Sequence, residues 1–198
     1  MNFTIKLLLL FFNFLHNINT FILRIGRQLA WTAILLMVIV IIIQVFFRYV
    51  LNNALPWPDE VARFLMLWMT GLIAPSAYRW GGFVSIDMLE RFLPKTLSNI
   101  LVFLILIISL IVLLIGFEMG LKHINAGWIF SSSSIKIPYS LLGGKTEAMK
   151  LAWMYMSLPV GIFLLISVNI ELTLKTILST FNSQINFPLD KDQERLET

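Results

Sequence analysis

The sequence predicts an all-α integral membrane protein with four transmembrane helices and an N-terminal amphipathic helix at the membrane surface. Three observations support this fold class. Of the 198 residues, 58% are hydrophobic and only 13% are charged, and the mean hydropathy is +0.84, which is more apolar than soluble domains. The apolar residues form long uninterrupted runs instead of short alternating ones. Charged residues flank these runs, so lipid is the solvent that the runs require.

The first 28 residues are predicted to form the surface helix. Lys6 and the apolar run after it are reminiscent of a secretory signal, but no small-x-small cleavage site follows. Polar residues recur at helical spacing and draw one stripe, while large apolar residues face away from it, as in a helix that lies in the membrane surface. The stripe comprises Asn13, His16, Asn17, Thr20, Arg24 and Arg27, and the apolar face comprises Leu15, Ile18, Phe21, Ile22 and Ile25.

The first transmembrane helix is predicted at residues 29–50. No charge falls between Arg27 and Arg48, and thirteen of the nineteen residues from Leu29 to Phe47 are Leu, Ile, Val or Phe. This length matches the roughly 20 residues that a helix needs to cross a bilayer.

The second transmembrane helix is predicted at residues 58–80 from its start signals. Pro58 suits the first helical turn, and Asp59 and Glu60 follow where the helix dipole favours anions. Pro75 lies inside the helix and is expected to bend it, because proline removes one backbone hydrogen bond.

The third and fourth transmembrane helices are predicted at residues 95–123 and 150–174. Seventeen of the twenty-two residues from Thr96 to Phe117 are Leu, Ile, Val or Phe. The fourth helix contains Pro159, which predicts a second bend. The remaining segments are a short interfacial segment at 83–94, an outer loop at 124–149 and a polar cytoplasmic tail at 175–198.

Basic residues indicate the orientation. With both termini in the cytoplasm, nine Lys and Arg residues lie on the cytoplasmic side and six on the outer side. This bias favours cytoplasmic termini in a multi-pass protein of the bacterial inner membrane.

The sequence gives little sign of catalytic or cofactor chemistry. There is no Cys, which excludes disulfides and thiolate metal sites. His16 and His123 are interpreted as ordinary interfacial residues, which disfavours haem, and the serines from Ser131 to Ser134 are interpreted as a flexible linker. Charged residues of the four spans fall in terminal turns, where snorkelling explains them. We therefore expect no catalytic residue, no metal and no cofactor, and the small net charge of +4 disfavours a nucleic-acid partner.

One cluster stands out between the first two spans, and it is the candidate interface or structural site. Its simplest interpretation is a helix start, in which Arg63 pairs with Asp59 and aromatic rings anchor the interface. In a functional interpretation, Arg48 faces Glu60 across the loop and fixes the two spans as a surface for a partner subunit. The candidate residues are Arg48, Tyr49, Trp57, Asp59, Glu60, Arg63 and Trp68.

This cluster resembles the small membrane subunit of tripartite ATP-independent periplasmic (TRAP) transporters. The matching motifs follow one another in a continuous stretch. They read Arg48-Tyr49, Leu55-Pro56-Trp57, Asp59-Glu60, Ala62-Arg63 and Trp68, and are followed by Arg79-Trp80-Gly81-Gly82, Asp87 and Leu93-Pro94. Later residues, Ile137-Pro138 and the group Tyr155, Pro159 and Gly161, are similar to the segment that leads into the family's last span.

The resemblance implies a four-helix partner of a large membrane permease subunit that holds a sodium-coupled substrate path. It also implies a periplasmic substrate-binding protein that delivers an organic acid or acidic sugar, with the lipid bilayer around the complex. Two departures are visible. Phe83 stands where many members have His, and about ten residues, Ser140 to Lys150, are inserted before the last span.

Two other classes remain as alternatives. A self-sufficient homodimeric transporter of four-helix chains needs a carboxylate inside the membrane. The first span has no acidic residue, and Glu118 and Glu171 are expected at span ends. A membrane enzyme lacks an assembled set of catalytic groups.

Overall fold

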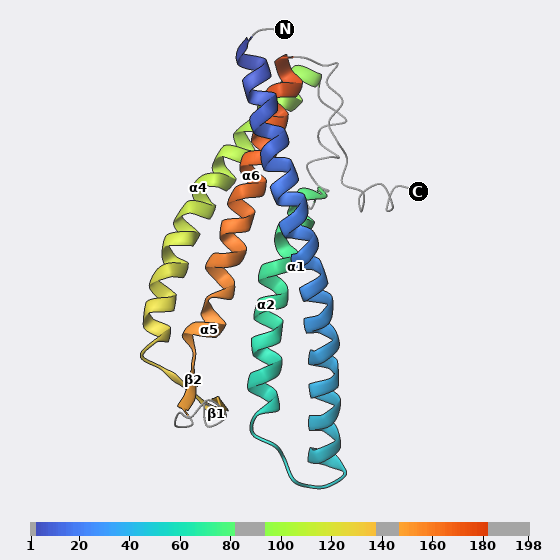
Figure 1. Ribbon diagram of the computed structural model, residues 1–198, viewed down its shortest axis with the longest axis vertical. Coiled ribbons are helices and arrows are strands. Elements are labelled where there is room, and N and C mark those ends of the chain that lie inside the picture. Colours follow the sequence, from blue (N-terminus) through green and yellow to red (C-terminus); the bar gives the residue numbers. More distant parts are fainter. Residues whose placement is uncertain (1–2, 82–93, 138–146, 182–198) are drawn as a thin grey trace. The chain divides into compact units, whose positions relative to one another are not determined.

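The computed structural model describes residues 3–81, 94–137 and 147–181 (Figure 1). Four of its helices are long and apolar enough to cross a membrane, which confirms the predicted fold class. The elements are α1 (Phe3–Tyr49), α2 (Pro58–Arg79), α4 (Lys95–Gly127), β1 (Ser131–Ile137), β2 (Glu147–Lys150), α5 (Ala152–Tyr155) and α6 (Ser157–Phe181). Most of the predicted segment 83–94 and residues 182–198 of the predicted tail lie outside the described residues.

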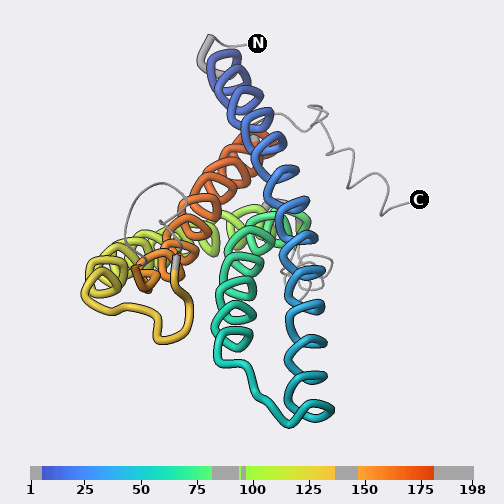
Figure 2. The backbone as a smooth tube through the Cα atoms, turned by 60° about the horizontal axis from the view of Figure 1, so that its bottom comes forward, coloured from blue at the N-terminus to red at the C-terminus, as the bar shows by residue number. Residues whose placement is uncertain are grey.

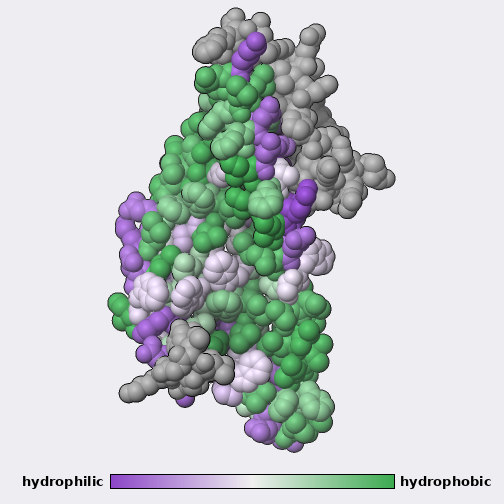
Figure 3. Space-filling model, in the orientation of Figure 1, coloured by the Kyte–Doolittle hydropathy of each residue, from purple (hydrophilic) through white to green (hydrophobic). Residues whose placement is uncertain are grey.

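Helix surfaces carry the apolar residues that a soluble protein would bury. Figure 3 shows hydrophobic side chains over the helices. The most apolar windows of α1 and α4 have mean hydropathies of 2.8 and 3.5, yet only 11% and 6% of their residues are buried. Surfaces of this kind fit a hydrocarbon environment.

Helix α1 is a single helix of 47 residues. At 1.5 Å per residue it is about 70 Å long, roughly twice the hydrocarbon thickness of a bilayer. No helix end lies at the predicted boundary between residues 28 and 29. The placement of the first part in the membrane surface stays a prediction.

The predicted polar stripe of α1 is divided between two environments. His16 and Arg27 are buried, whereas Asn13, Asn17 and Arg24 are exposed. The opposite apolar face is exposed as expected at Ile18, Phe21, Ile22 and Ile25. Part of the stripe therefore packs against protein instead of facing water.

The chain forms two compact units. Unit 1 comprises Met1–Ile25, Ala74–Ile115 and Phe163–Thr198, and unit 2 comprises Gly26–Ile73 and Gly116–Ile162. Phe12, Leu23, Leu106, Val168 and Leu178 are buried in unit 1. The buried apolar residues of unit 2 are smaller, namely Ala30, Ala33, Ala152 and Met154.

In unit 2 the backbones of α2 and α6 touch at two glycines. A Cβ on Gly71 would lie 2.6 Å from the carbonyl oxygen of Ser157, and a Cβ on Gly161 would lie 2.7 Å from that of Gly71. Because Pro75 has no N–H, the Gly71 carbonyl lacks its usual helical donor, and it faces Gly161 instead. Only glycine fits at either position.

The two prolines affect their helices differently. Helix α2 continues through Pro75. The fourth span is interrupted at Met156, between α5 and α6, three residues before Pro159. Since Pro159 cannot donate to the Tyr155 carbonyl, the regular ladder cannot continue across this point.

Strands β1 and β2 form an antiparallel two-stranded sheet in unit 2. Its register shifts between Ser131 and Lys136. The sheet was not foreseen, because the outer loop 124–149 was expected to have no regular structure. Open sheet edges need water as a hydrogen-bonding partner, so the sheet belongs outside the hydrocarbon.

Candidate functional site

The candidate cluster begins where α1 and α2 are joined. Figure 2 shows α1 and α2 side by side down to the connecting loop. Arg48 and Tyr49 end α1, Asn52 takes a positive φ of 48° in the loop, and Pro58 starts α2. Asp59 and Glu60 occupy the first turn of α2 as the sequence predicted.

Glu60 binds the serine run of β1. Its Oε1 accepts hydrogen bonds from Ser133 Oγ at 2.7 Å and from Ser133 N at 3.4 Å. Its Oε2 accepts from Ser132 Oγ and, at 3.4 Å, from Ser134 N. The carboxylate thereby holds β1 against the first turn of α2.

This contact corrects two interpretations drawn from the sequence. The serines are not a loose linker, because they form a strand and bind Glu60. Arg48 forms no ion pair with Glu60 within the described part of the chain, and its guanidinium lies 5.8 Å from the ring centre of Tyr49. Ser132 Oγ also accepts from Ile135 N at 2.8 Å, a local turn that accounts for the register shift.

Trp68 also faces the chain's own outer segment. Its indole N–H donates to the carbonyl of Trp153 at 3.1 Å, just before the interruption between α5 and α6. The ring of Trp153 contacts that of Trp128 edge to face at 6.2 Å. Trp68 thus supports the backbone where the last span is interrupted.

The other members of the cluster face outward. Arg48, Tyr49, Asp59 and Arg63 are exposed, and Trp57 is half-buried. The expected pair between Asp59 and Arg63 is not among the ion pairs of the described residues. The cluster therefore divides into two residues that bind the chain itself, Glu60 and Trp68, and several that do not.

A pocket of about 230 Å³ opens beside the Glu60 contact. It lies between the first turns of α2, strand β1 and α5. Its lining residues are Glu60, Arg63, Leu67, Ser131, Ser132, Ser133, Leu151, Met154 and Tyr155.

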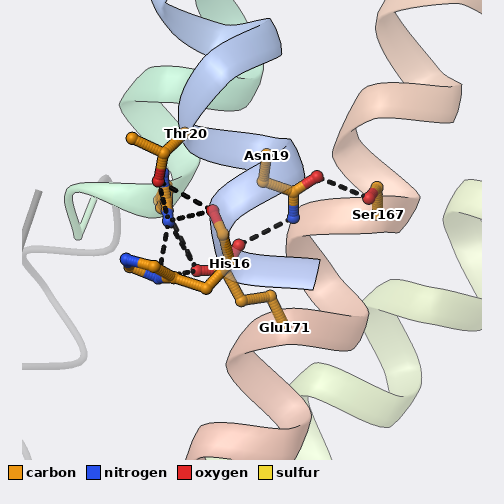
Figure 4. Close-up of polar contacts among 6 residues, drawn as sticks. His16, Asn19, Thr20, Ser167 and Glu171 are labelled. Atoms are coloured by element: carbon orange, nitrogen blue, oxygen red, sulfur yellow. Dashed lines mark hydrogen bonds and ion pairs between the residues drawn. The ribbon is translucent and has the colours of Figure 1, made fainter. Parts of the chain in front are cut away.

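A second polar site, which the sequence did not reveal, lies buried in unit 1 (Figure 4). Glu171 of α6 is 3% exposed, accepts hydrogen bonds from Arg79 of α2 and Asn19 of α1, and lies beside His16 of α1. Arg79 donates to Oε1 through Nε at 3.1 Å and through Nη2 at 2.7 Å. Asn19 donates to Oε2 at 2.7 Å, and His16 Nδ1 lies 2.9 Å from Oε1.

Further bonds extend this network along α1. Arg79 Nη2 donates to Thr20 Oγ1 at 2.9 Å, and Ser167 Oγ donates to Asn19 Oδ1 at 2.7 Å. His16 Nδ1 also lies 2.8 Å from Arg79 Nη2. The network ties the first part of α1 to the end of α2 and to α6.

Sequence reasoning assigned Arg79 and Glu171 to helix ends and His16 to an exposed polar stripe. Arg79 is 9% exposed and is held by the carboxylate, so snorkelling does not describe it. A buried ion pair is stable only when its hydrogen bonds are satisfied. One feature of the sequence could have indicated this network. His16 and Thr20 lie one helical turn apart, so they share the face of α1 that packs against protein.

Neither site forms a cluster of metal ligands. No group of three or more His, Cys, Asp or Glu residues that could hold a metal ion occurs among the described residues. Both sites join segments that are far apart in the sequence. Their chemistry suits them to hold helices together.

Comparison with known families gives one match. The model of the family described as tripartite ATP-independent periplasmic transporters, DctQ component, matches residues 37–178. This range includes the whole candidate cluster, Arg79 and Glu171, but not His16. Comparison with curated proteins finds no match.

Proposed function

Since this chain belongs to the DctQ component family of TRAP transporters, we propose that, as the small membrane subunit, it braces a large permease subunit. The family consists of transporter subunits, which are generally non-catalytic, and the chain is a multi-pass protein of the bacterial inner membrane. In the proposed complex the large subunit carries the sodium-coupled path. A periplasmic binding protein delivers an organic acid or acidic sugar.

The buried carboxylate of Glu171 is the observation that carries the bracing role. Four nitrogen atoms on two other helices lie within 3.1 Å of its oxygens. A group that moves a proton or ion must exchange its partners during the cycle. A buried carboxylate that is bound by side chains of two other helices instead fixes these helices relative to each other.

Purification in mild detergent tests this proposal. We expect the chain to retain a larger membrane protein, and we expect uptake in liposomes only when that protein and a soluble binding protein are both present. Recovery of the chain alone, with uptake by the chain alone, contradicts the bracing role.

A self-sufficient transporter is the second candidate, and one observation favours it. The sequence spoke against it because no carboxylate was expected inside the membrane, yet Glu171 is buried in the protein beside the imidazole of His16. The two candidates differ in the effect of Glu171→Gln. For a proton-coupling residue this variant abolishes uptake in an assembled, stable protein, whereas for a brace it lowers stability and uptake together.

The orientation is part of the proposal. We infer that both termini are cytoplasmic, because nine basic residues against six fall on that side. A reporter fused after Thr198 that is active only outside the cytoplasm would contradict this orientation.

A further inference from the structure

Helix α2 is the least apolar of the four spans, yet few of its residues are buried within its own chain. Its most apolar window has a mean hydropathy of only 1.2, the lowest of the four spans, and only 11% of that window is buried. The corresponding values are 3.5 and 6% for α4, and 2.8 and 11% for α1. The buried share of α2 is therefore the same as that of α1, although α2 is much less apolar.

Helix α6 shows what normally accounts for low hydropathy. Its window has a mean hydropathy of 1.8, but 39% of it is buried inside the protein. Asn169 and Glu171 are 0% and 3% exposed, so polar residues of α6 face the protein. A smaller share of α2 is buried, 11% of its window, and polar surface facing hydrocarbon is unfavourable.

The exposed residues of α2 in unit 2 lie on one face, which we name the α2 stripe. It consists of Asp59, Arg63, Met66, Leu67 and Thr70. Asp59 and Arg63 are four residues apart, and Met66 and Leu67 each lie three or four residues from both Arg63 and Thr70. Such spacings place all five on one side of a helix. The exposed residues of α4 from Leu97 to Ile115 are instead long and apolar, including Ile100, Leu104, Ile108, Ile111, Val112 and Ile115.

Polar groups on the α2 stripe are available to another protein. Within the described residues Arg63 makes no hydrogen bond or ion pair with another side chain. Thr70 donates its hydroxyl proton to the Met66 carbonyl at 2.8 Å, but its oxygen keeps lone pairs that can accept. An exposed arginine can snorkel in lipid. The low mean hydropathy of the whole span is therefore stronger support for a protein partner than Arg63 alone.

The pocket described above adjoins this stripe. Arg63 and Leu67 belong to both, and Met154 and Tyr155 also line the pocket. A volume of about 230 Å³ accommodates one large side chain. Interfaces commonly place one anchoring side chain in such a pocket.

We propose that the α2 stripe is the face on which a transmembrane helix of the large membrane subunit packs. The partner helix has small residues opposite Met66 and Thr70, which let the two backbones approach, and an acidic side chain level with Arg63. The exposed face of α4 meets lipid. This assignment rests on the proposed function, because it requires that a large subunit exists.

Photo-crosslinking in the purified complex tests the assignment. Benzoylphenylalanine is placed at Met66 or Thr70 on the stripe, and at Ile108 or Ile111 on α4 as matched controls. Met66 and Ile108 are similarly exposed, at 55% and 52%. We expect an adduct with the large subunit from the stripe and none from α4.

Three results would overturn the interface. These are adducts from α4 without adducts from the stripe, equal adducts from both faces, or an adduct between two copies of this chain from the stripe. If the unmodified chain retains no large membrane protein, the proposed function fails and the interface fails with it. Retention of the partner without an adduct from the stripe rejects the interface alone.

Two bulky substitutions provide a second measurement. Thr70→Phe should reduce retention of the large subunit about tenfold, since it blocks close packing at a helix interface. Val112→Phe on the exposed face of α4 should leave retention unchanged, because lipid accommodates the ring. Both variants must reach the membrane at the level of the unmodified chain, and equal retention in the two contradicts the proposal.

Discussion

Replacement of the buried charges around Glu171 gives the sharpest test of the packing. Arg79 and Glu171 are 9% and 3% exposed, and their closest atoms are 2.7 Å apart. We consider three variants, Glu171→Met, Arg79→Met and the double variant. Methionine keeps much of the volume of either side chain and carries no charge.

The magnitudes follow from what each variant leaves behind. Glu171→Met leaves the Arg79 guanidinium buried without its carboxylate, which destabilises the folded state by about 3–5 kcal/mol. Arg79→Met leaves a buried carboxylate with only His16 and Asn19 as donors, and a similar loss is expected. The double variant leaves neutral donors without an acceptor, a loss of about 1–3 kcal/mol. It should therefore be more stable than either single variant.

Equilibrium unfolding of the full chain in mild detergent with increasing SDS measures these losses. Glu118 and Lys122 provide the control, because they form an ion pair at 2.7 Å whose side chains are 69% and 72% exposed. Glu118→Gln should not change unfolding measurably. The reasoning is refuted if the losses of the single variants add in the double variant, or if Glu171→Met behaves like the control.

Three further predictions concern unit 2. Gly71→Ala places a Cβ 2.6 Å from a backbone oxygen and should destabilise the folded state by about 1–3 kcal/mol or more. Gly116→Ala meets only a side-chain carbon at 3.5 Å and should be tolerated. Equal stability of the two variants in SDS contradicts the observed helix crossing. Glu60→Ala should speed hydrogen exchange in β1, because the strand loses its four hydrogen bonds to the carboxylate. Asp59→Ala, at the neighbouring residue that makes no such bonds, should leave exchange unchanged. Unchanged exchange in both variants means that the carboxylate does not hold the strand. Trp68→Phe should lower the free energy of unfolding by about 0.5–1.5 kcal/mol, because it removes the hydrogen bond to the Trp153 carbonyl. An unchanged free energy of unfolding would show that water replaces the indole N–H.

The spans could be predicted because crossing a bilayer imposes a requirement on composition alone. A run such as that of α4 has one stable environment, whatever its neighbours are. The start of α2 was also predictable, since Pro58, Asp59 and Glu60 act within one turn. The sheet formed by β1 and β2 could not be predicted, because four serines have no hydrophobic alternation and the partner strand lies about ten residues away.

The polar contacts were harder to predict because they join distant segments. His16 and Glu171 are separated by 155 residues, and Glu60 and Ser132 by 72. Sequence reasoning considered nearby partners, so it paired Glu60 with Arg48 and Asp59 with Arg63. The observed partners depend on which helices pack together, and helix packing in membranes is set by shape and small residues that local patterns do not specify.

The charged network changes the reason for regarding this chain as a scaffold. The sequence suggested a scaffold because no ionisable group was expected in the bilayer interior, and it did not reveal that Glu171, Arg79 and His16 are buried together inside the protein. The scaffold role now depends on how Glu171 is held, since three nitrogen atoms lie within 3.1 Å of its Oε1 and Asn19 Nδ2 donates to its Oε2. A transport site must offer a position that a proton, ion or solute can take without dismantling the fold. Protonation of Glu171 would remove the charge that holds the Arg79 guanidinium and would weaken the contacts that join α1, α2 and α6, so these residues are better explained as the link between the three helices.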